Sequence, residues 1–123
     1  QFLIPIMKEC HRVLKDGAIM SCVIDLQDHY SYFDKQISVY NFLQFSDKKW
    51  AKYNHSIQYQ NRLRASDYIY LFVESGFKVL EIEKELPDSS EEKELMSINI
   101  NKKFSNYNYE DLSVKVLKIV LKK

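Results

Sequence analysis

Glycine is scarce in this chain: its 123 residues include only Gly17 and Gly76. With two glycines so far apart, no Gly-x-Gly turn of the kind that cradles a nucleotide can form. Cysteine is equally scarce, and Cys10 and Cys22 have neither a CxxC spacing nor a matching histidine pattern. The sequence therefore excludes a self-contained glycine-rich loop and a cysteine-based metal or redox centre, and we expect both cysteines to be small core residues.

An excess of either charge is also absent, because 18 basic and 17 acidic residues leave a net charge of +1. This balance argues against nucleic acid as a partner. No apolar run approaches the roughly 20 residues that a membrane helix needs, so we expect no membrane span and a cytoplasmic protein. A hydrophobic content of 46% is typical of one folded domain or part of one.

The N-terminal quarter of the chain has the clearest pattern. Apolar residues recur at helical spacing and predict an amphipathic helix over residues 2–15, which Gly17 ends. The apolar run that follows does not alternate with polar residues. It predicts a strand over residues 18–25 that is buried on both faces. Because ligands bind beyond the carboxyl ends of strands in open α/β sheets, the polar residues just after this strand are site candidates.

Weaker patterns organise the rest of the chain. Residues 28–64 form an aromatic-rich insertion, in which Tyr32 to Val39 are expected to be helical and Ser46 to cap a further helix. Ser66 and Asp67 should cap the helix that Gly76 ends. The remaining expected elements are a strand near the sheet edge at 77–86, a short helix or turn at 91–100 and a last strand at 113–121.

Two strings resemble a known family. Arg12-Val13-Leu14-Lys15-Asp16-Gly17 is similar to the Arg-Val-Leu-Lys-Pro-Gly segment late in class I S-adenosylmethionine-dependent methyltransferases, with Asp16 in place of the usual proline. The string Tyr59–Arg64, then Tyr68 and Glu74–Phe77, resembles the late helix of that family and its Gly-Phe exit into the sixth strand. The order of the expected elements resembles the C-terminal half of that fold along the whole chain.

The resemblance implies an α/β fold: the C-terminal part of a Rossmann-like methyltransferase sheet, with three strands and a helical insertion. The last strand would run antiparallel between the other two. It also implies S-adenosylmethionine as the cofactor of a longer parent protein, since the family's glycine turn is missing here. The expected function is methyl transfer to a small-molecule or glycan-type acceptor, with this fragment inactive alone. A non-catalytic interaction or structural module derived from the same fold is the alternative.

Asp25, Asp28 and His29 lie where such a fold places its acceptor. Methyl transfer to a hydroxyl or amine requires a base, and imidazole titrates near neutral pH, so His29 and Asp25 are the catalytic candidates and Asp28 a substrate-binding one. A structural role is equally open for Asp25 and Asp28, because aspartates at such a position commonly cap the next helix. His29 would then be a solvated loop residue.

Further substrate-binding candidates come from the insertion. Arg62 and Arg64 are suited to clamp a carboxylate or phosphate of the acceptor, or else to pair with Asp67 or Glu74. Trp50, Tyr59 and Asn61 are candidate pocket walls, although a purely packing role for the aromatic residues is open too. We also expect the uncovered edge of strand 18–25, or the face of helix 2–15, to promote self-association.

Overall fold

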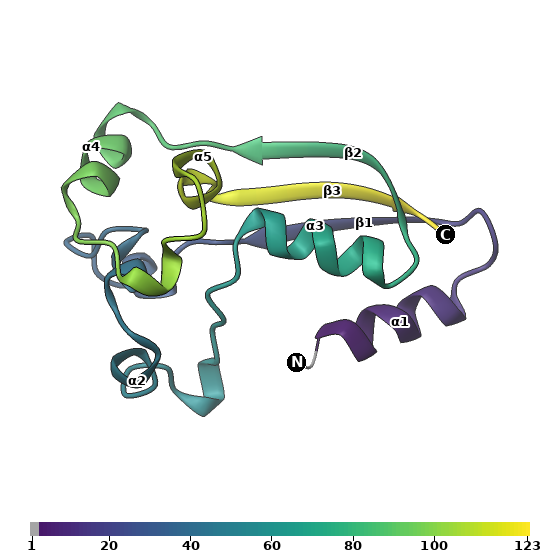
Figure 1. The fold of residues 1–123 in the computed structure, drawn as a ribbon, viewed down its shortest axis with the longest axis horizontal. Helices are drawn as coiled ribbons and strands as arrows, with labels where there is room; N and C mark the ends of the chain where they lie inside the picture. The colour runs from purple at the N-terminus through teal and green to yellow at the C-terminus, as the bar shows by residue number, and fades with distance from the viewer. Residues whose placement is uncertain (1–2) are drawn as a thin grey trace.

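The computed structural model describes residues 3–123, which form one three-stranded sheet, helices on one of its faces, and a loop-rich end (Figure 1). The sheet region consists of α1 (Leu3–Val13), β1 (Ile19–Asp25), α3 (Ala65–Glu74), β2 (Lys78–Glu85) and β3 (Val116–Lys122). The loop region, residues 26–64 and 86–115, contains α2 (Asp47–Trp50), α4 (Ser89–Ser97), α5 (Tyr109–Ser113) and short 3-10 turns.

The strand order is β1-β3-β2, and β3 is antiparallel to both neighbours. Sequence analysis predicted this order and this direction for the last strand, and both are confirmed. β2 is an edge strand as expected, but β1 is an edge strand too. The expected start of β3 at residue 113 is wrong, because Ser113 ends α5, whose N-terminus is capped by Asn108.

The two helices of the sheet region cover the same face of the sheet. Leu117, Ile119 and Leu121 of β3 point to this face, where they are buried against apolar side chains of α1 and α3. On the opposite face of β1, Ile19 and Val23 are 53% and 73% exposed. The prediction that this strand is buried on both faces is therefore wrong, because no helix among residues 3–123 covers that face.

Gly76 ends α3 as predicted, but Gly17 does not end α1, because that helix stops at Val13 and Gly17 lies in the turn that follows. Gly17 and Gly76 have φ of 78° and 98°, a conformation that side chains with a Cβ rarely adopt. A Cβ on Gly76 would also meet the ring of His11 at 3.1 Å. Helix α1 ends at Val13, two residues before the expected boundary, and its expected first residue, 2, lies outside the described part of the chain.

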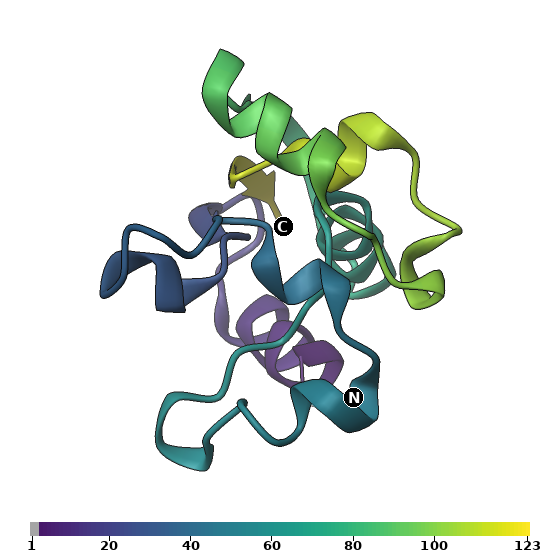
Figure 2. The same ribbon diagram turned by 90° about the vertical axis from the view of Figure 1, so that its left-hand side faces the viewer.

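The loop region has its own core, which is mostly aromatic. Tyr40, Phe42, Leu43, Trp50, Leu95, Phe104 and Leu112 form it. The expected helix at Tyr32–Val39 is absent: 3-10 turns at His29–Tyr32 and Asn41–Gln44 flank an irregular segment instead. Ser46 caps α2 as predicted, and Asp88 caps α4. Figure 2 shows these short elements grouped at the end of the sheet where β1 and β2 finish.

Arg64 lies where the cores of the two regions meet, because Leu26 and Val114 pack in the core of the sheet region and Leu112 in that of the loop region. Its side chain is fully buried, and its guanidinium donates hydrogen bonds to the main-chain oxygens of Leu26, Leu112 and Val114 at 2.9, 3.0 and 2.6 Å. Burial lowers the pKa of Arg64 to about 10, so the side chain stays charged at neutral pH. Tyr40 links the two segments of the loop region, because its hydroxyl donates to the oxygen of Ser113 at 2.7 Å.

Candidate functional site

Asp25 and His29 come together at the carboxyl end of β1. The carboxylate Oδ2 of Asp25 lies 3.3 Å from Nε2 of His29 across one turn of chain, and both side chains are one-third exposed. The angles of this contact do not meet hydrogen-bond criteria, so the interaction is mainly electrostatic. No hydrogen bond within residues 3–123 uses Nδ1, the other ring nitrogen of His29.

Tyr32 and Gln27 hold the Asp25 carboxylate in place. The Tyr32 hydroxyl donates to Oδ2 of Asp25 at 2.5 Å, and the main-chain N–H of Gln27 donates to Oδ1 at 3.0 Å. Burial, followed by the hydrogen bond to Asp25, raises the pKa of Tyr32 to about 12, so Tyr32 remains a donor at neutral pH. The ring of Tyr32 also stacks on His29, with centroids 5.6 Å apart.

Gln60 positions the His29 backbone from the far end of the insertion. Its side-chain oxygen accepts from the His29 N–H at 3.3 Å, and its side-chain amide donates to the main-chain oxygen of Gln27. Sequence reasoning missed Gln27, Tyr32 and Gln60. Gln27 and Tyr32 are close to Asp25 in the sequence, and this closeness could have identified them. Gln60 is 31 residues from His29, so no feature of the sequence indicated its contact.

Asp28 has the capping role that sequence analysis left open. It is fully buried, and its side chain accepts from the Tyr30 N–H at 3.0 Å and from the Asn41 amide at 3.0 Å. A substrate would have to displace these internal donors to reach it. The predicted substrate-binding role of Asp28 therefore has no support in this geometry.

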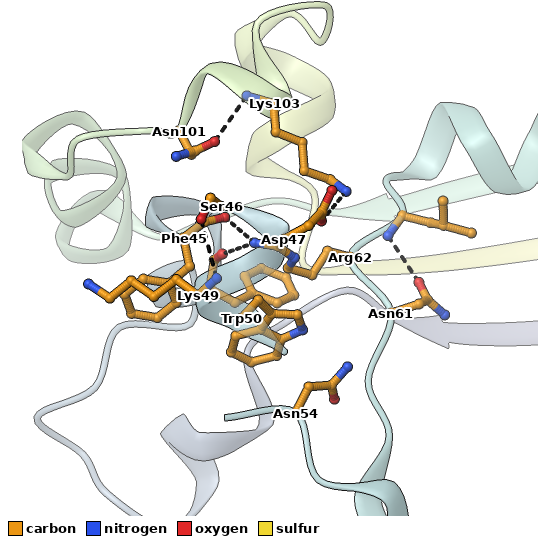
Figure 3. Close-up of polar contacts among 12 residues, drawn as sticks. Phe45, Ser46, Asp47, Lys49, Trp50, Asn54, Asn61, Arg62, Asn101 and Lys103 are labelled. Atoms are coloured by element: carbon orange, nitrogen blue, oxygen red, sulfur yellow. Dashed lines mark hydrogen bonds and ion pairs between the residues drawn. The ribbon is translucent and has the colours of Figure 1, made fainter. Parts of the chain in front are cut away.

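The two predicted clamp arginines are both used internally. Arg64 is buried in the core and bonded to main-chain oxygens, so it cannot contact an acceptor and that prediction is wrong. Arg62 donates to the oxygens of Phe42 and Phe45 and, at 2.6 Å, to the Asp47 carboxylate. It therefore holds the loop region together, lying over the ring of Trp50 (Figure 3).

Tyr59, Asn61 and Arg62 line one cavity of about 470 Å³ together with Lys103. Lys103 comes from a distant part of the sequence and shares the Asp47 carboxylate with Arg62 (Figure 3). The hydrogen bond from Lys103, and next that from Arg62, lower the pKa of Asp47. Trp50 lies elsewhere, in the walls of two cavities on the side of His29.

Neither a membrane helix nor a metal cluster is found within residues 3–123. No helix there is both long and apolar enough to cross a bilayer. No group of three or more histidine, cysteine, aspartate or glutamate side chains in the same residues could hold a metal ion. The Asp25–His29 pair, with Tyr32 and Gln60 around it, is the arrangement best suited to proton transfer.

No family model matches the chain, and no curated protein matches it significantly. One solved structure with a similar backbone is a protein from Bacillus halodurans C-125 that is provisionally named as a methyltransferase. The two share 14% identity and align with a TM-score of 0.48, over 98% of this chain and 57% of that one. The chain thus spans little more than half of that structure, and a similarity this low is no guide to activity.

Proposed function

We propose that this chain is the acceptor-side, C-terminal half of a class I S-adenosylmethionine-dependent methyltransferase. The observation that carries the proposal is the strand order β1-β3-β2, with the last strand antiparallel between the other two. The family resemblance of the Arg12–Gly17 string implies the same order from the sequence alone. A last strand that inserts between two earlier strands is a specific arrangement, because consecutive strands more often lie side by side.

The residues of this chain do not fit the cofactor by themselves. The family holds S-adenosylmethionine with a glycine-rich turn, whereas Gly76 ends a helix against His11 and Gly17 lies in the turn before β1, near Lys122. We therefore assign cofactor binding to another part of the parent protein. The role proposed for these residues is to position the acceptor and accept its proton.

In this role His29 is the general base. The nearby Asp25 carboxylate favours a proton on Nε2, which leaves the lone pair of Nδ1 free to accept a proton from an acceptor hydroxyl or amine. Tyr32 and Gln27 keep the carboxylate oriented, so that the pair needs little rearrangement during the reaction.

Cofactor binding provides the first test. Calorimetry with S-adenosylmethionine is carried out on this chain and on the longer protein that contains it. Binding by the longer protein alone supports the proposal. Binding by neither favours the alternative, a non-catalytic interaction or structural module, and Asp25 and His29 would then be structural residues.

A substitution tests the base directly. In the longer protein, His29→Ala should lower kcat about 100-fold with little change in KM, because proton transfer is lost while binding surfaces remain. His11→Gln is the matched control, since His11 packs on Phe77 away from the site. A change of only a few-fold for His29→Ala would remove it as the base.

A further inference from the structure

Two cavities lie near the candidate site and share two wall residues. The larger, of about 290 Å³, is lined by Tyr30, Ile37, Asn41, Phe45, Trp50 and Tyr53. The smaller, of about 40 Å³, is lined by His29 itself and also by Tyr30 and Trp50. The two cavities therefore share the walls formed by Tyr30 and Trp50, and only the smaller one reaches His29.

The walls of the larger cavity are aromatic rings in fixed orientations. Phe45 and Trp50 are nearly parallel, with an interplanar angle of 12° and centroids 6.2 Å apart, while Tyr30 meets Trp50 edge-on. The Tyr30 hydroxyl donates to the main-chain oxygen of Tyr53 at 2.5 Å, which holds the Tyr30 side chain against the segment that carries Tyr53. Such a cavity is preorganised for a flat apolar group.

Most amide side chains around both cavities are hydrogen bonded within the protein, with Gln58 of the smaller cavity as the exception. Asn54 pairs with the main chain of Gln60 in both directions, at 2.9 and 2.8 Å. Gln60 bonds to the backbone at Gln27 and His29, and Asn41 donates to Asp28 and accepts from Gln44. A glycan would need these groups for its hydroxyls, because a buried hydroxyl without a hydrogen-bond partner is costly.

The charge of the residues that line the two cavities also favours a neutral ligand. None of the residues that line them is an aspartate, glutamate, lysine or arginine. A cationic group would therefore lose its hydration without gaining a partner of opposite charge. Lys49 places its Nζ 4.7 Å from the centroid of the Phe45 ring, so an anionic probe tests whether that ammonium attracts a charged ligand. A neutral ring loses little hydration and gains contact with the aromatic residues of the lining.

We propose that these paired cavities bind an uncharged aromatic group, and that the natural acceptor carries such a group. The claim about the natural acceptor rests on the proposed function, in which the acceptor's hydroxyl or amine reaches His29 through the smaller cavity. The claim that the cavities bind an aromatic group does not depend on that function. Of the two acceptor classes that the sequence left open, the geometry thus favours an aromatic small molecule over a glycan.

Trp50 gives a direct readout, because it is the only tryptophan of the chain and has one indole N–H signal in a ¹⁵N NMR spectrum. That N–H donates to the main-chain oxygen of Gln60 at 3.3 Å, and both residues line the smaller cavity. Three probes are titrated into the chain: p-cresol as a neutral ring, p-toluate as its anionic match, and methyl β-glucoside as a glycan. We expect a saturable shift with p-cresol only.

Variants locate the binding. Tyr30→Ala should weaken p-cresol binding about fivefold, the size of one lost aromatic contact. Tyr109→Ala is the matched control, since both tyrosines are 43% exposed and both hydroxyls are hydrogen bonded, but Tyr109 lies on α5. Tyr53→Ala is the second test and should also weaken p-cresol binding, because Tyr53 is another wall of the larger cavity. The Tyr30 hydroxyl keeps its hydrogen bond in this variant, since its acceptor is a main-chain oxygen.

Three results would overturn the proposal: a larger shift with the glucoside or p-toluate, no shift with any probe, or equal weakening by the Tyr30 and Tyr109 variants. None of these readouts involves methyl transfer. A protein that binds p-cresol but shows no cofactor-dependent activity would therefore contradict the proposed function and leave the aromatic site intact.

Discussion

The core of the sheet region is mostly aliphatic, with Leu117, Ile119 and Leu121 packed against α1 and α3 and only Phe72 and Phe77 as buried aromatic residues. The core of the loop region is aromatic, with Tyr40, Phe42, Trp50 and Phe104 at its centre. Main-chain hydrogen bonds between strands hold the first together, while side chains such as Arg62 and Asn54 bond the main chain of the second. The comparison teaches that the region with the least regular backbone carries the candidate site, because individual side chains determine its shape.

The residue that joins the two regions should be the most sensitive position. Arg64→Leu leaves the oxygens of Leu26, Leu112 and Val114 without their donor in a buried place, so we expect a loss of at least about 3 kcal/mol in unfolding free energy. Denaturant unfolding followed by Trp50 fluorescence and by far-ultraviolet circular dichroism measures it.

The same experiment tests the link between regions. If Arg64 joins them, both probes should shift together in Arg64→Leu. Arg12→Leu is the control, because the Arg12–Glu9 pair is exposed and its loss should leave stability almost unchanged. A shift of the fluorescence transition alone would show that Arg64 supports only the loop region.

A matched pair of truncations compares the two cores. Leu117 and Leu43 are both fully buried, one in each region, and each is changed to alanine. We expect about 3–5 kcal/mol for Leu117→Ala, because a strand held on both sides cannot close the cavity, and about 2–3 kcal/mol for Leu43→Ala, whose loop can partly relax. Equal losses in denaturant unfolding would show that the loop region is as rigid as the sheet.

The uncovered edge and face of β1 should make the sheet region associate. β1 has no lysine or proline to protect its edge, and Val23 is 73% exposed. We expect sedimentation to show concentration-dependent association of this chain, and Val23→Lys to abolish it without loss of stability. A monomeric wild-type chain at high concentration would disprove this expectation.

The smallest effect concerns the pKa of Tyr32 in the loop region. That pKa is raised from 10.0 to about 12 by burial and by Asp25, so the associated stabilisation is complete below pH 10 and is lost as the pH rises through 12. Asp25→Asn should lower this pKa but leave it above 10, since burial, the largest cause, remains. NMR titration of ¹³C-labelled tyrosines measures it.

The control for this titration is Glu92→Gln. Glu92 accepts from Tyr109 and raises its pKa, so this substitution should move the titration of Tyr109 and leave that of Tyr32 unchanged. An unchanged Tyr32 pKa in Asp25→Asn would show that the two side chains do not interact in solution.

The sequence by itself determined the elements whose signals are local. Gly76 ends α3 because only glycine adopts positive φ at low cost, and Ser46 caps α2 because its side chain reaches a nearby N–H. Hydrophobic periodicity located the sheet and both packed helices, and the resemblance implied the strand order that the structure confirms.

Only the tertiary structure decided the roles of the polar residues in the insertion. Arg62 and Arg64 look alike in the string Asn-Arg-Leu-Arg, yet one supports the loop core and the other joins the two regions. Gln60 reaches His29, and Lys103 reaches Asp47, across 31 and 56 residues. Such contacts depend on how loops pack around an aromatic core, and no local pattern in the chain encodes that packing.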